Sequence, residues 1–464
     1  MSCLHCTTPA SKSLTTFSFG FSLEGDYRRL RPIMAGGPIG ADEMGHRGHG
    51  VKSAAVFGLA MLGLIGQAEA QASDKNWMNA VVGTSTYASN DLSDRELIKE
   101  WEANPEKGVP TLSPSNIIPL KAAVIRYTAI VAKGGWRTLP DMKLAPGTSN
   151  AAVAILRERL ALSGELKDGG ASESYDYAVE KAVRRYQASN GLAPTGIVDK
   201  GTVAALNVPA ESRLKQLKAN LTRLQEFAKA PAKYIAVNIP AAQVEAVQNG
   251  AVVSRHAGVV GKIDRPTPIL KSAIHELNFN AVWTLPPTVI EKDLIPKGQE
   301  MAKRGQSVLV KFKIDAYGGD GRKLDAEKVS WGGTSAKSLT FRQQPGPENP
   351  LGFVKMNFHN AHSVYMHDTP GQSLFGRNFR AASSGCVRIA GIETLAAWVV
   401  AEQGWRPEHV QQIKQNGERR DVQLSKPIPL YFAYITAWAT PDGDVQFRRD
   451  IYQKDGIGAQ AAAY

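Results

Sequence analysis

The spacing of apolar residues changes from a helical to a strand period near residue 233, and this change constrains the fold more than any other feature. Upstream, apolar residues recur three and four positions apart, as in amphipathic helices. Downstream, residues 233–261 alternate apolar and polar side chains around Asn249-Gly250, a pair typical of a two-residue hairpin turn. The chain is therefore predicted to be a multidomain α+β protein whose β-rich part is a mainly antiparallel β-sandwich.

The helical part divides into three predicted segments. Residues 73–150 contain a helix between Leu120 and Trp136 that ends at a Gly-Gly pair, and we expect a helical scaffold there. Residues 151–208 contain three short amphipathic helices, enough to close a small core. One more amphipathic helix defines a linker over residues 209–231.

The β-rich part covers residues 232–425 and contains a polar insertion at about 291–350. The insertion is rich in Lys, Gly and Gln and includes the string DAYGGDGRKLD, which predicts a hairpin. A polar segment between β elements is expected to form a capping subdomain, a lid rather than core. The last residues, 426–464, are assigned to a C-terminal extension.

Residues 44–72 have the layout of a secretory signal peptide. Arg47 and Lys52 precede an apolar run over residues 54–65, and small residues in A-x-A spacing follow. A membrane-spanning helix needs about 20 apolar residues, and this run is shorter. We therefore expect export to the periplasm and a mature chain without a transmembrane segment.

The segment before this signal, residues 1–43, has no periodic pattern and is rich in Gly, Ser and Pro. The export machinery reads a free N-terminus, so synthesis is inferred to start at Met44 or at Met34. Residues 1–43 are then an untranslated or disordered leader.

The net charge of +12 raises the question of an anionic partner. Nucleic acid conflicts with export, and no nucleic-acid-binding motif is present. An anionic polymer or membrane surface of the cell envelope fits better, and a charge that serves solubility alone fits equally well.

The string SSGCVRI contains Cys386, whereas the other two cysteines, Cys3 and Cys6, lie at the extreme start of the chain. After cleavage of a signal peptide, Cys386 has no disulfide partner, so it is either a small buried hydrophobe or a reactive thiol. A thiol is activated by a neighbouring imidazole that accepts its proton and stabilises the ion pair. Backbone N–H groups around Gly385 and Cys386 could then hold an oxyanion.

The imidazole for this pair is found in the string FHNAHSVYMHDTPG. Ser363 to His367 are predicted to form a strand, in which Tyr365 and His367 point to the same face. A zinc site made of His359, His362 and His367 is the alternative, but His362 and His367 would lie on opposite faces of that strand. No metal and no cofactor is therefore expected.

The H-D-T-P string followed by S-S-G-C-V-R resembles the L,D-transpeptidases with a YkuD-type catalytic domain, in particular their long periplasmic Gram-negative class. The strings VVGKIDRPTPIL and NFNAVWTLPPTVIEKDLIPK resemble earlier blocks of that class. Residues 151–208 resemble the peptidoglycan-binding domain of exported wall enzymes. An Ala281 stands where the class often has proline, and Ser384 stands where many relatives carry another residue.

The resemblance implies a role for each matching residue. Cys386 would be the nucleophile that takes the acyl group of a tetrapeptide stem and expels its terminal D-alanine. His367 would be the general base and later the general acid, oriented by the backbone carbonyl of Asp368. The remaining residues would line the site or hold the oxyanion: Tyr365, Ser384, Gly385 and Arg388. For Arg388 both a contact with a substrate carboxylate and a brace for the loop are open.

The implied reaction joins peptidoglycan stem peptides through 3→3 links between diaminopimelate residues, and carbapenems would acylate the same thiol. Three alternatives stay open. The same Cys-His pair could catalyse hydrolysis, as a carboxypeptidase or wall hydrolase. The acceptor could be a lipoprotein or a free D-amino acid instead of a stem peptide. A non-catalytic wall-binding protein is the third.

Overall fold

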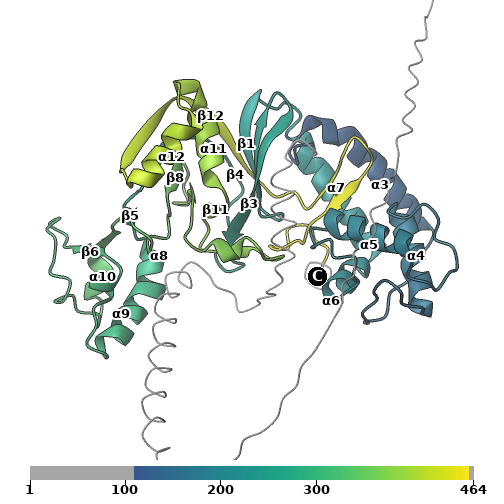
Figure 1. Ribbon diagram of the computed structural model, residues 1–464, viewed down its shortest axis with the longest axis horizontal. Coiled ribbons are helices and arrows are strands. Elements are labelled where there is room, and N and C mark those ends of the chain that lie inside the picture. The colour runs from purple at the N-terminus through teal and green to yellow at the C-terminus, as the bar shows by residue number, and fades with distance from the viewer. Residues whose placement is uncertain (1–108, 459–464) are drawn as a thin grey trace, which may run out of the picture. The chain divides into compact units, whose positions relative to one another are not determined.

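The computed structural model describes residues 109–458 (Figure 1). These residues belong to the second of two compact units, Ile65–Tyr464. The predicted leader 1–43, the signal peptide 44–72, and Cys3 and Cys6 lie outside the described residues. No helix within 109–458 combines the length and the apolar character that crossing a membrane requires.

The described chain is helical up to β1, which begins at Lys233, as the apolar spacing predicted. Side-chain caps define the starts of three helices: Asn150, Asp176 and Asp199 each accept a hydrogen bond from a backbone N–H of the first turn. These three helices, α4 to α6, share one buried core that includes Leu156 and Tyr186. The five α-helices of this part are α3 (Ile117–Ala132), α4 (Ala151–Ser163), α5 (Tyr177–Ser189), α6 (Lys200–Leu206) and α7 (Ala210–Gln225).

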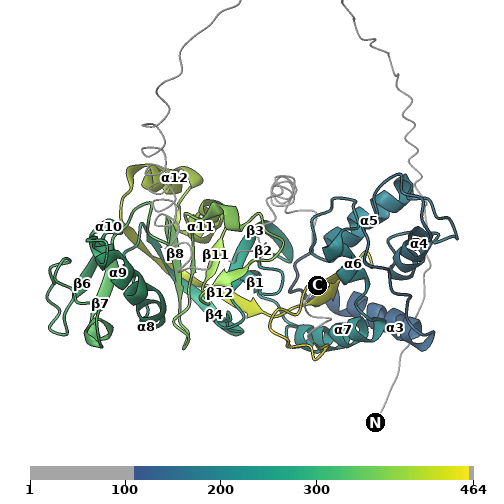
Figure 2. The ribbon, with the colours of Figure 1, turned by 90° about the horizontal axis from the view of Figure 1, so that it is seen from below.

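Helices α3 and α7 pack side by side and against a C-terminal hairpin (Figure 2). This hairpin consists of β13 (Ala437–Ala439) and β14 (Val445–Phe447), which pair in antiparallel register. The ring of Phe447 lies 5.7 Å from the ring of Tyr127 in α3. The end of the chain therefore packs on helices that lie far earlier in the sequence.

Nine strands form one mixed, mainly antiparallel sheet in the order β10-β3-β11-β9-β8-β4-β12-β1-β2. Strand β2 also pairs with β3, so the hydrogen-bonded ladder closes on itself. The sequence predicted a sandwich of two sheets, whereas the strands around the site are joined in this single ladder. The nine strands are β1 (Lys233–Asn238), β2 (Gln243–Gln248), β3 (Ala251–Gly261), β4 (Leu270–Phe279), β8 (Val354–Phe358), β9 (Met366–His367), β10 (Ala381–Ser383), β11 (Val387–Ile389) and β12 (Arg420–Ala433).

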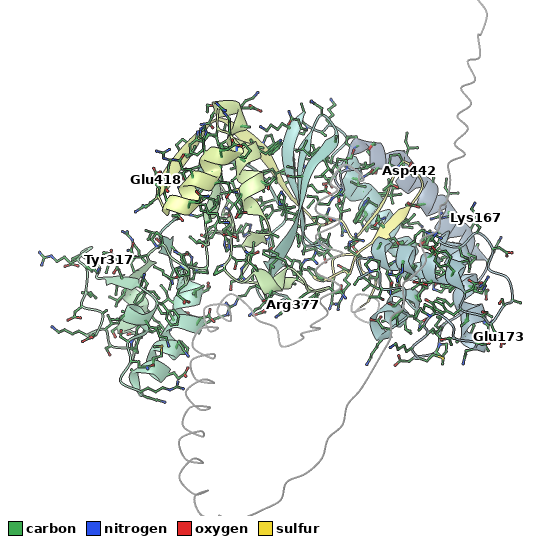
Figure 3. All side chains as sticks on the ribbon, viewed as in Figure 1. Lys167, Glu173, Tyr317, Arg377, Glu418 and Asp442 are labelled. Atoms are coloured by element: carbon green, nitrogen blue, oxygen red, sulfur yellow. The ribbon has the colours of Figure 1, made fainter. Side chains whose placement is uncertain are left out.

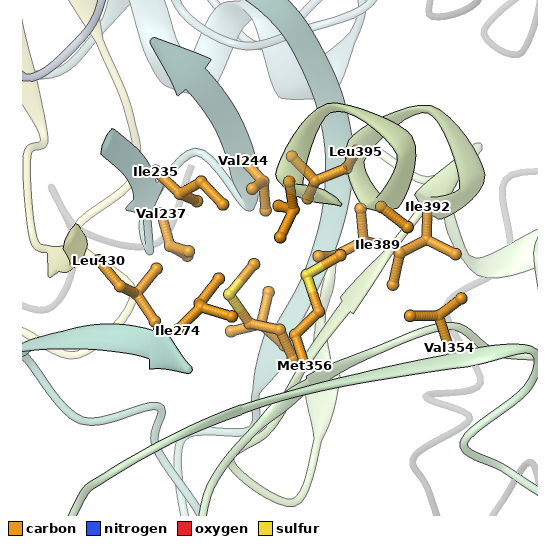
Figure 4. Close-up of a cluster of buried hydrophobic side chains, with 14 of the residues drawn as sticks. Ile235, Val237, Val244, Ile274, Val354, Met356, Ile389, Ile392, Leu395 and Leu430 are labelled. Carbon is orange, nitrogen blue, oxygen red and sulfur yellow. The ribbon is translucent and has the colours of Figure 1, made fainter. Parts of the chain in front are cut away.

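The core of this part lies between the sheet and two helices, α11 (Ile392–Val400) and α12 (Pro407–Asn416). Figure 4 shows Ile392 and Leu395 of α11 facing side chains from several strands, among them Val354 and Met356 of β8. All four of these side chains are fully buried. The first turn of α11 is thereby fixed directly behind β11.

Strand β12 crosses the domain boundary that was predicted at residue 425. It lies between β4 and β1, where Leu430 pairs with Ser272 on one side and with Ile235 on the other. The boundary predicted at residue 425 therefore falls inside a central strand. The rest of β12, to Ala433, belongs to the nine-stranded sheet, whereas β13 and β14 pair with each other and pack on α3 and α7.

The insertion also differs from the prediction, because it has a core of its own. It begins before residue 291, at β5 (Trp283–Thr284), and its buried residues include Leu294, Phe312 and Phe341. Figure 3 labels Tyr317, the last residue of strand β6 in this insertion. Its other elements are α8 (Pro287–Val289), η3 (Ile290–Leu294), α9 (Ile295–Ala302), α10 (Val308–Lys311), β6 (Ile314–Tyr317) and β7 (Thr340–Gln343).

The central place of β12 yields a stability prediction. Leu430→Ala removes a fully buried side chain and should lower the free energy of unfolding by about 2–5 kcal/mol. Lys426→Ala, on an exposed position of the same strand, should change it by less than about 0.5 kcal/mol. Urea unfolding followed by circular dichroism measures both. Equal, small effects would contradict the assignment of β12 to the core.

Candidate active site

A cavity of about 290 Å³ brings together the two residues that the sequence singled out. Cys386 and His367 both line it, as do Tyr365 and Ser384. The insertion supplies the other wall, from Trp283 and the segment from Pro286 to Val289 among others. A larger cavity of about 340 Å³, between the end of α5 and the β1–β2 turn, contains neither Cys386 nor His367.

The pairing of β9 with β11 explains why the two residues meet. The strands are parallel, with Met366 opposite Val387 and His367 opposite Arg388. The backbone N–H of Val387 donates to the carbonyl of Tyr365 at 3.1 Å. Cys386 immediately precedes β11, so it lies beside the end of the strand that carries His367.

The strand predicted from Ser363 to His367 is shorter than expected. Only Met366 and His367 are in β9, and Ser363 has a φ of +54°, which a strand residue does not adopt. The side chain of Asn360 organises the preceding loop, since its amide donates to Val364 O at 2.8 Å. The rings of Tyr365 and His367 are nevertheless neighbours, with centroids 5.6 Å apart.

Hydrogen bonds to buried hydroxyl groups hold the loop around Cys386. The hydroxyl of Ser383 donates to Cys386 O at 2.5 Å and accepts from Gly385 N at 3.1 Å. Gly385 has a φ of +116°, a region that favours glycine. Because its N–H is engaged by Ser383, the N–H of Cys386 is the better placed of the two expected oxyanion donors.

A second hydroxyl ties this loop to the β3–β4 connection. Thr267 donates to Gly385 O at 2.8 Å and accepts from Gly261 N at 2.8 Å. Tyr452, from the end of the chain, in turn donates to Gly261 O at 2.6 Å. Sequence analysis assigned no role to Ser383, Thr267 or Tyr452. The Thr-Pro pair inside VVGKIDRPTPIL was the only available signal.

The protonation of His367 follows from its backbone contact. Its Nδ1 lies 2.5 Å from the carbonyl oxygen of Asp368. A carbonyl only accepts, so Nδ1 carries the hydrogen and Nε2 keeps its lone pair in the neutral ring. The Asp368 carboxylate instead accepts from Phe353 N at 2.8 Å, so it does not orient the imidazole.

Loss of contact with solvent favours the uncharged form of both groups, of which His367 is buried and Cys386 is partly exposed. It is the main cause that lowers the pKa of His367 to about 3, and the positive charge of Arg388 acts in the same direction. Burial likewise raises the pKa of the Cys386 thiol to about 11, against the opposite effect of a hydrogen bond from the Tyr365 backbone and of the nearby cations. At neutral pH the resting state is therefore a neutral thiol beside a neutral imidazole.

Tyr365 connects the thiol to the insertion. The indole Nε1 of Trp283 donates to the Tyr365 hydroxyl oxygen at 2.9 Å. The same hydroxyl is hydrogen-bonded to Cys386, and burial raises the pKa of Tyr365 well above its ordinary value. Tyr365 is thus a neutral group that touches the sulfur and is fixed by the insertion.

The remaining predicted site residues occupy different positions. Ser384 lines the cavity and accepts a hydrogen bond of 2.9 Å from Arg265, which also reaches Asp293 of the insertion at 3.4 Å. Arg388 is fully buried and does not line the cavity, so of its two predicted roles the bracing of the loop fits its position better. Gly385 and Asp368 also lie outside the lining.

The histidines of the alternative zinc site are separated. His359 stacks on His275 at 4.2 Å between ring centroids, whereas His362 and His367 border the cavity. Within residues 109–458, no group of three or more His, Cys, Asp or Glu side chains has an arrangement suited to a metal ion.

Comparison with known families agrees with the motifs. Residues 232–414 match the family model of the L,D-transpeptidase catalytic domain, YkuD, and residues 149–206 match that of a "Putative peptidoglycan binding domain". The resemblance indicated by the sequence strings is thereby confirmed for these two parts of the chain.

The individual relatives agree with this assignment. A protein of Haemophilus influenzae described as "Putative L,D-transpeptidase" is 28% identical over 221 residues, which make up 48% of this chain. The chain spans only 44% of the length of that relative.

Three solved structures are also similar. The L,D-transpeptidase of Stackebrandtia nassauensis is 12% identical, with 64% of this chain and 96% of that chain covered and a TM-score of 0.26. For the enzyme of Xylanimonas cellulosilytica the identity is 13%, the coverage 64% and 98%, and the TM-score 0.20. LdtMt1 in complex with imipenem is 15% identical, with 43% and 58% covered and a TM-score of 0.20. TM-scores this low support no argument about function.

The raised thiol pKa predicts how Cys386 reacts with iodoacetamide. Only the thiolate is alkylated, so the rate should be low at pH 7 and should still be rising above pH 9. Mass spectrometry of the peptide that contains Cys386, sampled from pH 6 to pH 10, measures this rate. An exposed thiol such as that of glutathione, with a pKa near 8.5, serves as the control. If the alkylation rate of Cys386 stops rising at the same pH as that of glutathione, or at a lower pH, the neutral thiol is contradicted.

Proposed function

We propose that this protein is a peptidoglycan L,D-transpeptidase that forms 3→3 links between diaminopimelate residues through a cysteine acyl-enzyme. The observation that carries the proposal is that Cys386, immediately before β11, and His367, in the paired strand β9, line one cavity. The match of residues 232–414 to the L,D-transpeptidase catalytic domain supports the same reaction class.

In the proposed first step, Nε2 of His367 takes the proton of the Cys386 thiol. The sulfur attacks the carbonyl carbon of the third stem residue, and the oxyanion that forms accepts a hydrogen bond from the Cys386 N–H. His367 then donates its proton to the nitrogen of the terminal D-alanine as the C–N bond breaks. A thioester on Cys386 and free D-alanine result.

In the proposed second step, the amine of an acceptor stem attacks the thioester carbon. His367 takes a proton from this amine and returns it to the sulfur as the C–S bond breaks. A new amide bond forms, and the enzyme regains its thiol and neutral imidazole. No cofactor enters this balance.

The proposed setting is the periplasm, where the substrate is found. Export rests on the signal peptide predicted at residues 44–72, which lie outside the described part of the chain. The family match of residues 149–206 supports contact with peptidoglycan. We propose the matching domain boundaries as well, with the catalytic domain extended to include β12. Carbapenems, whose strained ring offers a carbonyl to the thiol, are proposed inhibitors.

Hydrolysis by the same pair is the second candidate function. The thioester is attacked by water if water reaches it before an amine does. The cavity lining, which includes Trp283 and Pro286 to Val289 of the insertion, does not by itself favour either outcome. Neither the cavity nor the family match identifies the acceptor, whether it is a stem peptide, a lipoprotein or a D-amino acid.

Product analysis tests this proposal. With disaccharide-tetrapeptide as substrate, the protein should give cross-linked dimers and free D-alanine, and Cys386→Ala should give neither because no thioester can form. Cys386→Ala must melt like the wild type for the comparison to hold. Free tripeptide without dimers would assign hydrolysis, and dimers from Cys386→Ala would refute the acyl-enzyme.

A further inference from the structure

A lysine that no motif singled out lies beside the candidate catalytic pair. Lys355 in β8 is in register with His367 in β9, which is in register with Arg388 in β11. Residues directly opposite each other on neighbouring strands project to the same face. The sheet therefore aligns a cation on each side of His367.

The side chain of Lys355 lies on the ring of Tyr365. Its Nζ is 4.7 Å from the ring centroid, within the range of a cation–π interaction. Lys355 is only partly exposed. The hydroxyl group of the same Tyr365 side chain accepts the hydrogen bond from Trp283. The Tyr365 hydroxyl is hydrogen-bonded to Cys386. The Tyr365 side chain is therefore in contact with both the Lys355 ammonium group and the Cys386 sulfur.

The electrostatics of the site support a link between the two groups. Burial lowers the pKa of Lys355, and the strongest opposing influence is the charge of Cys386. The reciprocal effect lowers the pKa of the Cys386 thiol, after larger contributions from the Tyr365 backbone and Arg388. A positive charge in a partly dry site stabilises a nearby anion more than it would in water.

Two carboxylates also influence Lys355. Glu276 of β4 and Asp421 of β12 also act on it, but more weakly than Cys386. Both carboxylates already accept hydrogen bonds from amides, Glu276 from Asn357 at 2.7 Å and Asp421 from Asn278 at 2.8 Å. Lys355 thus has acidic groups on the side of β4 and β12 and the thiol on the side of β9 and β11.

We propose that Lys355 is a positioning residue of this site, whose ammonium group fixes the Tyr365 ring and stabilises the negative charge on the Cys386 sulfur when His367 removes its proton. The same charge disfavours a lasting imidazolium, so it promotes return of the proton to the leaving group. This inference rests on the function proposed above, in which Cys386 is the nucleophile.

The test compares Lys355→Met, which removes the charge but keeps the length, with Lys355→Arg, which keeps the charge. The alkylation rate of Cys386 by iodoacetamide is measured from pH 6 to pH 10. Lys355→Met should shift the profile upward by about one pH unit, roughly a tenfold slower reaction at fixed pH. Lys355→Arg should restore a profile close to that of the wild type, and Lys271→Met, at an exposed position of β4, should leave it unchanged.

Thermal melts identify any variant that fails to fold, and Lys355→Gln replaces Lys355→Met if that occurs. A purely structural role would lower the melting temperature without moving the pH profile, and an unmoved profile in a folded neutral variant would overturn the proposal. The profile does not depend on transpeptidation. A shift in Lys355→Met alongside a wild type that makes no cross-links would therefore reject the proposed function and keep the role of Lys355.

Discussion

The parallel pairing of β9 with β11 is the interaction on which the candidate site depends. It brings His367, the last residue of β9, to the same cavity as Cys386, which immediately precedes β11. Both strands have very few residues, so their own ladder contributes little stability. Their register is fixed instead by the longer strands β3 and β8 on either side and by α11 behind them. A slip of one residue would turn His367 away from the cavity.

Burial of this pair determines which protonation states the site can use. A thiolate–imidazolium pair, the activated form expected from sequence, needs a stabilised cation on His367. The structure supplies the opposite, because Arg388 and the low polarity of the site disfavour that cation. The neutral pair fits a mechanism in which the proton moves only while the sulfur attacks, so that charge develops on the substrate oxygen and not in the resting enzyme. A resting thiol is also less easily oxidised than a thiolate.

Much of the site followed from the sequence, because the residues that carry chemistry lie in short, contiguous strings. The H-D-T-P and S-S-G-C-V-R strings placed His367 and Cys386 without knowledge of the fold. The sequence could not predict the contacts made across long separations. Lys355 is near the site because the sheet order places β8 beside β9, and long-range hydrogen bonds bring in Thr267, from the β3–β4 connection, and Tyr452, which follows β14. Tyr452 and Lys355 have no distinctive neighbourhood in the sequence, and Thr267 had only the string VVGKIDRPTPIL.

The fold shows the same division between local and distant information. Helices α4 to α6 were predictable, since their caps and apolar spacing are local. The place of β12 was not, because alternation in a strand says nothing about which strands become its neighbours. The sequence did not indicate that the predicted capping insertion has a core of its own, because that core is assembled from residues scattered between Ala281 and Leu351. A scattered set leaves no periodic signal.

The core of the insertion changes what this subdomain can do. A flexible flap would have to order itself around the substrate, whereas a folded unit can form one wall of the cavity before the substrate arrives. Two polar links join this wall to the reacting groups: Trp283 to Tyr365, and Asp293 through Arg265 to Ser384. Movement of the insertion would therefore change the contacts around the Cys386 thiol. In the proposed reaction, which must admit an amine while limiting water, such coupling would allow the state of the wall to influence which acceptor reaches the thioester.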